Sequence, residues 1–455
     1  MTHHLPYPSG RLSAFQRVMY SWSELHPYNA THTYQLAGPV DVPRLRGAIT
    51  ATYRDLGIGV VELAANGRTF HWERGTAEEI PVIAGGRDWQ GTFSQHITQE
   101  LNRPFARPRC QPMRFSVVEG CDGSSSLTMS YDHWVADSFA TRLVLRHVLG
   151  RYLRLDLPEN DRPLTLYPDT YRKMFPHHLG ARHLAGAALR AWSQWRRDRA
   201  PVLPAYSCVT QMAVNYEFHR TAPGTAIRLQ QFAHSLGATV HDVLLAALAR
   251  SLARVLPRRA RRGCAPEIAL GTIVDTRSEA VEDLGDSLGA FLSNFLVRCR
   301  PEESSDLAEL TGQIASLTGP IKQRRRYFDA VVLMRVASVL WPWVRPSTRP
   351  HFMRHAMPMT AGISNVRLRD DWTEKAGGRI LGYSRGVSTG PMLPLVLSPT
   401  TLGEEMNLGI SYRLTGFTRE KIDLLVESLL EEIERVEPVG VGHAFLVPRS
   451  VPAAA

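Results

Sequence analysis

One stretch of the chain combines a strand pattern with a helix pattern around a single histidine. Apolar and polar residues alternate over residues 127–131, which is the period of a half-buried strand. Apolar residues then recur at near-helical spacing over residues 139–152, and Asp137 or Ser138 stands at the N-cap position. A strand that runs into a helix over so few residues predicts an α/β fold with His133 at the end of the strand.

His133 and Asp137 lie four residues apart at this turn. A histidine at the end of a strand is aimed by a rigid element, and a neutral imidazole there can act as a general base. An aspartate in the turn can fix the surroundings of that base. A buried histidine followed by an ordinary capping aspartate gives the same pattern, and about one such pair is expected by chance in a chain of this composition. The motif by itself does not distinguish a catalytic histidine from a buried structural one.

Size and composition indicate two ordinary domains. The chain has 455 residues, of which 44% are hydrophobic and 21% are charged, as is typical of a globular protein. No apolar run is long enough to span a membrane, and the N-terminus lacks the layout of a signal peptide. We therefore predict a cytoplasmic protein. The 5 cysteines are widely spaced without a Cys-x-x-Cys, so we expect reduced thiols and no metal site.

The basic residues are almost all arginines. The net charge is +10, and arginines cluster at residues 196–199, 258–262 and 324–326. These clusters are either solvated faces or docking sites for an acidic partner, such as the phosphates of coenzyme A or an acidic carrier protein. Nucleic acid is not an expected partner, because no aromatic-interleaved basic stripe or known reader motif is present.

The order of the predicted elements divides the chain into two α/β halves, residues 1–175 and 176–455. The pattern of the first half predicts helices over 12–22 and 42–53, a strand over 33–36 and a hairpin around Asn66-Gly67. The pattern of the second half predicts helices over 226–236, 240–255 and 418–436 and strands over 267–274 and 408–414. The proline-rich stretch after Leu157 predicts the crossover. Two halves of similar make-up predict two open-sheet domains with a cleft between them.

A series of short motifs follows one another along nearly the whole chain. They are Leu12-Ser-Ala-Phe-Gln16, Asn102-Arg-Pro104-Phe105, Pro112-Met-Arg114, Tyr131-Asp-His133-Trp-Val-Ala-Asp137-Ser138, Gly237-Ala-Thr239, Gly271-Thr-Ile-Val-Asp-Thr-Arg277, Leu288-Gly-Ala-Phe-Leu-Ser-Asn294 and Ile363-Ser-Asn365-Val. In this order the chain resembles the condensation-domain superfamily of acyltransferases, whose relatives include chloramphenicol acetyltransferase, plant acyltransferases and free-standing polyketide or wax-ester acyltransferases. The resemblance implies two chloramphenicol-acetyltransferase-like open-sheet sandwich domains with an active site in the cleft or tunnel between them. It also implies that residues 363–366 form a late strand that crosses between the halves.

The chain departs from the family's His-His-x-x-x-Asp-Gly motif at two positions. The first histidine is Asp132 here, and the glycine is Ser138. The histidine that the family uses for chemistry aligns with His133, so the resemblance implies a catalytic base at that position. The added Cβ of Ser138 would narrow the acceptor side or mark a non-catalytic relative.

The resemblance also implies roles for other residues. Arg277 is the expected partner of Asp137, in an ion pair that would lock the turn carrying His133. We expect substrate contacts from Asp132, Trp134, Ser138, Asn294 and Asn365. Core packing is the alternative for Trp134, and an ordinary turn position is the alternative for each asparagine.

The implied reaction is acyl transfer from a thioester to a hydroxyl or amine, which gives an ester or amide in natural-product biosynthesis. His133 would take the proton of the attacking nucleophile, so no covalent acyl-enzyme, bound cofactor or metal is expected. The donor would be acyl-CoA or a thioester on a separate carrier protein, because the carrier-like stretch at residues 283–288 is one residue short of an attachment site. We expect a monomer.

Two alternatives stay open. One is a catalytically silent condensation-like module that binds a carrier protein. The other is a membrane-associated wax-ester or lipid acyltransferase, in which the apolar segment 327–344 would lie in the membrane interface. In an ordinary acyltransferase the same segment would be a structural or channel-lining helix.

Overall fold

The computed structural model describes residues 9–65, 67–155, 165–166, 171–179, 185–187, 189–190, 201–257, 267–284, 287–301, 306–356, 358–368 and 374–437. Two of the arginine clusters (196–199 and 258–262), Asn66 of the predicted hairpin and most of the proline-rich crossover lie outside these described residues.

The N-terminal half is built on a sheet with the strand order β16-β2-β8-β7-β5. Its strands are β2 (Asn29–Leu36), β5 (Val82–Ala84), β7 (Met113–Glu119), β8 (Ser125–Asp132) and β16 (Ile380–Val387). Helices α3 (Trp89–Asn102) and α4 (Ser138–Leu153) cover opposite faces of this sheet, because His96 of α3 bonds Ser116 of β7 whereas Thr141 of α4 bonds His32 of β2. The central strand β8 ends immediately before His133.

A second, smaller sheet and three more helices complete this half. It has the order β1-β4-β3-β6, with β1 (Ser9–Arg11), β3 (Gly59–Leu63), β4 (Thr69–Arg74) and β6 (Arg109–Cys110). The antiparallel pair β3–β4 is the predicted hairpin. The helices are α1 (Ala14–Trp22), α2 (Val42–Leu56) and α5 (Tyr171–Met174). Helices α1 and α2 confirm the predicted segments at 12–22 and 42–53.

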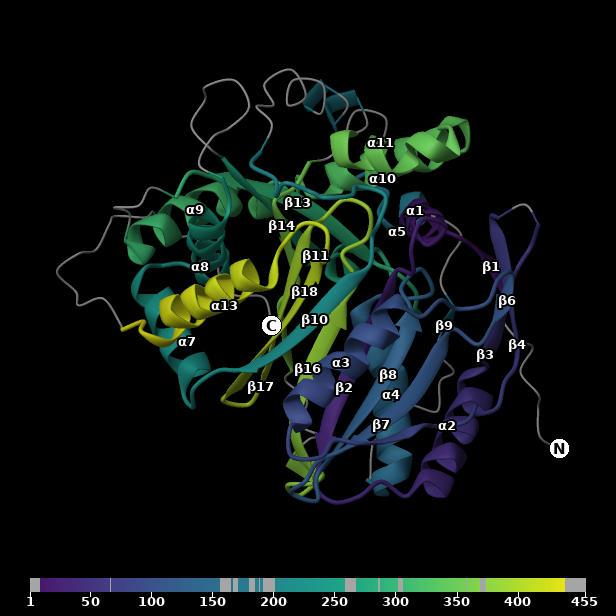
Figure 1. Ribbon diagram of the computed structural model, residues 1–455. Helices are drawn as coiled ribbons and strands as arrows, with labels where there is room; N and C mark the ends of the chain where they lie inside the picture. The colour runs from purple at the N-terminus through teal and green to yellow at the C-terminus, as the bar shows by residue number, and fades with distance from the viewer. Residues whose placement is uncertain are drawn as a thin grey trace.

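The C-terminal half is built on a sheet with the order β10-β18-β17-β14-β11-β13, to which β15 adds at β17. Its strands are β10 (Val214–Arg220), β11 (Ile268–Asp275), β13 (Leu292–Cys299), β14 (Ala361–Ile363), β15 (Val366–Leu368), β17 (Leu395–Leu402) and β18 (Glu405–Arg413). Helices α7 (Thr225–Ser235), α8 (Val240–Val255), α9 (Leu307–Gln323) and α13 (Arg419–Glu434) pack together beside it (Figure 1). Among the described helices, none is by itself long and apolar enough to cross a membrane.

The remaining elements lie at the edges of the two halves. Strands β9 (Thr165–Leu166) and β12 (Ser287–Leu288) pair in parallel. Helix α10 (Phe328–Leu340) packs against α1, and α11 (Arg349–Ala356) follows it in the chain (Figure 1). Ser287, the serine of the carrier-like stretch, is buried in β12 and is therefore not placed to carry a phosphopantetheine arm. Helices α3 and α9 were not predicted; the buried face of α3 includes His96 and Glu100, which weakens its apolar pattern.

The strand that crosses between the halves is β16, which corrects the prediction of a crossing strand at residues 363–366. β16 comes late in the chain but pairs antiparallel with β2 of the first sheet, and it packs against β17 and β18 of the second. The predicted segment stays in its own sheet, where β14 lies between β11 and β17 in parallel pairing. Its short run of small and apolar residues is typical of a strand buried on both faces.

The contact between β16 and β18 requires a glycine on β18. A Cβ on Gly409 would lie 2.1 Å from the carbonyl oxygen of Arg385. We therefore expect Gly409→Ala to lower the free energy of unfolding by about 1–3 kcal/mol in denaturant titrations. Gly312→Ala in α9 is the matched control, because a Cβ there meets nothing within 4 Å, and it should be neutral or stabilising by up to about 1 kcal/mol. Equal stability of the two variants would contradict a tight junction at β16.

Candidate active site

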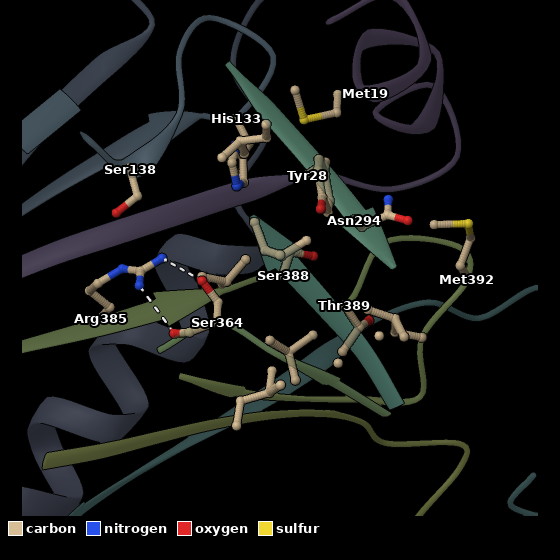
Figure 2. Close-up of a pocket in the computed structure, with 18 of the residues that line it drawn as sticks. Met19, Tyr28, His133, Ser138, Asn294, Ser364, Arg385, Ser388, Thr389 and Met392 are labelled. Atoms are coloured by element: carbon tan, nitrogen blue, oxygen red, sulfur yellow. Dashed lines mark hydrogen bonds between the residues drawn. The ribbon is translucent and has the colours of Figure 1, made fainter. Parts of the chain in front are cut away.

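A cleft lined by residues of both halves lies between them and opens to solvent. Its wall combines α1, the turn after β8 and α4 with strands β11, β13, β14 and β16. His133 lies in this wall (Figure 2). Figure 2 shows Ser138, Ser364 and Arg385 on one side of His133 and the thioethers of Met19 and Met392 on the other. Asn294, Ser388 and Thr389 lie on the same side as the two thioethers, so polar groups line the cleft on both sides of the imidazole, whereas Arg385 lies on one side only.

The ring of His133 is held in one place by aromatic neighbours. It stacks on Tyr28 with a centroid distance of 5.2 Å and an interplanar angle of 9°, and its backbone N–H donates to the Tyr28 carbonyl at 3.0 Å. Tyr131 meets the ring edge-on at 5.6 Å. Burial, the largest cause, lowers the pKa of His133 below its ordinary value, and the charge of Arg385 lowers it further. His133 is therefore neutral at pH 7 and able to accept a proton.

The opening helix braces the turn that carries this histidine. Gln16 of α1 donates from its side-chain amide to the carbonyls of Trp134 and Val135, at 3.1 and 3.3 Å. It also completes a capping box with Ser13, the N-cap of its own helix. The first motif of the chain therefore supports the fourth through direct hydrogen bonds.

Asp137 ties the same turn to the segment at residues 288–294. It is fully buried, and its Oδ1 accepts from the Ala140 N–H at 2.9 Å, as an N-cap does. The other oxygen, Oδ2, accepts from the Phe291 N–H at 2.8 Å. The Asp137 N–H donates to the Gly289 carbonyl at 2.9 Å. These hydrogen bonds occupy both oxygens of the carboxylate. Its role is therefore to position the turn.

Arg277 contacts Asp137, as predicted, through both Nη atoms of its guanidinium. Nη2 donates to Oδ1 at 2.9 Å, and Nη1 lies 2.8 Å from Oδ2. The guanidinium lies between the rings of Phe139 and Phe291, at 4.5 and 4.6 Å from their centroids. Arg277 also pairs with Asp275, which is half-exposed. Burial alone would lower the pKa of Arg277, but the two carboxylates outweigh it and raise the pKa.

Asp132 and Trp134 face away from the cleft, which corrects the prediction that they contact substrate. Asp132 is the last residue of β8, where successive side chains point to opposite faces, and Trp134 lies in the turn that follows. Asp132 Oδ2 accepts from Trp134 Nε1 at 3.0 Å and from Arg107 Nη2 at 3.2 Å, and both motif side chains are buried. Burial raises the pKa of Asp132, although Arg107 opposes this. The structure therefore favours core packing for both residues.

Ser138, Asn294 and Asn365 do line the cleft. Ser138 lies where α4 begins, Asn294 lies on β13, and Asn365 follows β14. The Oδ1 atom of Asn365 is buried and accepts no hydrogen bond from the described residues. Their contact with substrate stays a prediction.

Tyr28 and Arg385 also line the cleft, and no motif in the sequence predicts either of them. Tyr28 precedes a strand and belongs to no motif, and burial raises the pKa of its hydroxyl, so it is a neutral phenol. Arg385 is an isolated arginine among the small and apolar residues of β16. A lone charge inside such a buried strand is the signal that identifies it.

One group outside the cleft has the composition of a metal site. The ligand atoms of Glu62, His71 and Glu73 lie within 4.8 Å of one another on the small sheet. Arg109 ion-pairs with Glu73 there and lies 3.9 Å from Glu62, so the group is already balanced by a cation. It is not part of the cleft.

Comparison with protein families matches residues 10–327 to the Condensation domain. The chain is similar in structure to the first condensation domain of the calcium-dependent antibiotic synthetase in complex with a substrate analogue, with a TM-score of 0.68, 14% identity, and coverage of 96% of this chain and 100% of that one. For the condensation domain of the monacolin K polyketide synthase MokA, the TM-score is 0.66 at 14% identity, with 94% and 98% of the two chains covered.

A third similar structure is the epimerization domain from the third module of tyrocidine synthetase B, with a TM-score of 0.62, 13% identity, and coverage of 94% of this chain and 97% of that one. A search of curated proteins found no match. At these identities the solved structures establish the shared fold, and the family match covers well over half of the sequence. The chain therefore belongs to the condensation-domain family.

Proposed function

We propose that this protein transfers an acyl group from a thioester to a hydroxyl or amine acceptor, with His133 as the general base. Membership in the family supports acyl or peptidyl transfer in general. The observation that carries the proposal is the neutral, buried imidazole in the wall of the cleft between the two halves. An imidazole so placed can remove the proton of a nucleophile as it attacks the thioester carbonyl.

The bonds and the proton of this acyl-transfer step balance without a cofactor. The nucleophile's oxygen or nitrogen bonds to the thioester carbon, its proton passes to His133, and the carbon–sulfur bond breaks with return of that proton to the thiolate. We propose that the donor is acyl-CoA or a carrier-bound thioester. We also propose that the enzyme is a monomer and acts in a natural-product pathway in the cytoplasm. Family membership supports a carrier protein as one kind of partner.

The donor and the base are tested together by following thiol release from a panel of acyl-CoA and carrier-loaded thioesters with mixed alcohol and amine acceptors. His71→Ala is the matched control for His133→Ala, because His71 is half-exposed on the small sheet. We expect turnover in the wild type and in His71→Ala, and loss of turnover in His133→Ala. Equal activity in all three proteins would exclude His133 as the base.

The pH dependence of kcat/KM reports the free imidazole. Because burial lowers the pKa of His133, the neutral, active form is present at pH 7 and is lost only as the pH falls through that lowered pKa. We therefore expect a level profile around neutral pH and a decrease on the acid side, with an apparent pKa below 6.5. An inflection above this value would assign the base to another group.

A membrane-associated enzyme is the second candidate, and the surface of α10 favours it. Val336, Val339 and Leu340 are each about half-exposed there, and Trp343 beyond the helix is 85% exposed. Cosedimentation with anionic lipid vesicles tests this candidate. Binding that Trp343→Ala abolishes would support it, and wild-type protein that stays in the supernatant would exclude it.

A further inference from the structure

Arg385 is a buried cation in the wall of the cleft. It is 2% exposed and lies on β16, the strand that joins the two halves. Its Nη1 and Nη2 atoms donate to the carbonyl and hydroxyl of Ser364, at 3.3 and 3.2 Å (Figure 2). Its Nε atom is buried and has no hydrogen-bond partner among the described residues. The guanidinium therefore has donor capacity that the described residues leave unused.

No carboxylate of the described residues forms an ion pair with Arg385. Asp275 is the acidic residue in the described part of the cleft wall, and Arg277 already pairs with it. The other charged residue on this side is a second cation, Arg142, whose Nε donates to the Ser138 carbonyl. Burial and the charge of Arg385 lower the pKa values of His32 and His133, so both imidazoles are neutral. Among the described charged residues of the cleft wall, Arg142 and Arg385 therefore outnumber the single carboxylate.

A buried guanidinium without a counter-charge is destabilising, and a ligand that supplies the negative charge would offset that cost. The planar fork of an arginine matches a carboxylate, which accepts two parallel hydrogen bonds. Ser364 already holds one edge of the fork in position. The apolar side chains of the cleft wall, Met19 and Met392 among them, suit the rest of such a molecule.

We infer that one of the two substrates carries a carboxylate and that Arg385 binds it inside the cleft. The inference rests on the proposed function, because it names the chemical class of a substrate for the same site. A carboxylate held by Arg385 would place the attached chain in the cleft that His133 lines.

Isothermal titration of the wild-type chain with hexanoate and with hexanamide tests this binding site without any turnover. The two probes have the same length and differ in charge. We expect hexanoate to bind at least about tenfold more tightly, as charge-assisted hydrogen bonds allow. Arg385→Gln should abolish this preference and leave the affinity for hexanamide unchanged. Arg254→Gln is the matched control, because Arg254 lies on the outside of α8 and pairs with Glu432.

A second variant covers the case in which Arg385→Gln fails to fold. Arg385→Lys keeps the charge and loses the fork, so it should bind hexanoate more weakly than the wild type but still more tightly than hexanamide. Inorganic phosphate and free coenzyme A are titrated in parallel. If these bind through Arg385 and hexanoate does not, the site recognises phosphate and the carboxylate inference is wrong.

Equal affinity of the wild type for hexanoate and hexanamide would also overturn the inference. So would a kinetic result in which Arg385→Gln lowers kcat equally for charged and neutral substrates with KM unchanged, because Arg385 would then stabilise the transition state. The two proposals fail separately. A carboxylate preference without acyl transfer would retain the binding site and remove the proposed function, whereas acyl transfer without the preference would do the reverse.

Discussion

Replacement of His133 by alanine is expected to lower kcat by about 10²–10⁴-fold, the usual contribution of a positioned general base. The nucleophile would then have to lose its proton to water, while the cleft and both substrate sides stay in place. His133 makes its described backbone hydrogen bond through its N–H to Tyr28, and this bond survives the substitution. We therefore expect a folded variant whose melting temperature is close to that of the wild type, measured alongside steady-state kinetics.

The substitution His133→Gln separates proton transfer from packing. Glutamine retains polar atoms on the Tyr28 ring but cannot take a proton at neutral pH, so it should be as inactive as alanine. A glutamine variant with wild-type kcat would mean that His133 only orients substrate. Rescue of the alanine variant by added imidazole would support its role as a proton acceptor.

Replacement of Asp137 by alanine is expected to lower the free energy of unfolding by about 3–5 kcal/mol. The carboxylate is fully buried, and its loss leaves the Arg277 guanidinium without its buried partner and the Phe291 N–H without its acceptor. Such a loss is a large part of the stability of an ordinary domain. We expect activity to fall mainly through unfolding or loosening of the turn, which urea titration and thermal melting would detect. A well-folded variant with a normal melting temperature would contradict this role.

Asp275→Ala is the matched control for the ion pair. Asp275 also pairs with Arg277, but its side chain is 45% exposed, so we expect a loss of only about 0–1 kcal/mol. The double variant Asp137→Ala with Arg277→Met should recover part of the stability lost in the single variant, because no unpaired buried charge remains. Additive losses would show that the two residues act independently.

Local patterns in the sequence predict most of the elements that carry the site. The alternation before His133 and the helical spacing after Asp137 correspond to β8 and α4, and Asp137 is the N-cap. These features depend on neighbouring residues, so the sequence contains them directly. The contact between Asp137 and Arg277 spans 140 residues and followed from the resemblance rather than from any local pattern.

The join between the halves was not predictable in the same way. β16 pairs with β2 across more than half of the chain, as the bond between His32 and Tyr383, 351 residues apart, illustrates. Strand pairing over such a separation depends on the whole fold and leaves no local periodicity. Arg385 was missed for the same reason, because its strand was not recognised.

The placement of Asp132 and Trp134 outside the cleft has a simpler cause. Both residues adjoin His133 in the motif, but adjacency in sequence does not imply adjacency to substrate, and core packing is the alternative that holds for Trp134. The two-residue period of β8 places Asp132 on the face opposite Tyr131, whereas Trp134 lies in the turn after the strand and is held by its hydrogen bond to Asp132.

The most direct test of acyl transfer is to measure thiol release and acylated product together, by mass spectrometry, with one thioester donor in the presence and absence of acceptor. We predict that release depends on acceptor, that one acylated product forms for each thiol released, and that both signals vanish in His133→Ala. Thiol release that is independent of acceptor and equal in wild type and variant would mean simple hydrolysis elsewhere, and it would contradict acyl transfer by this cleft.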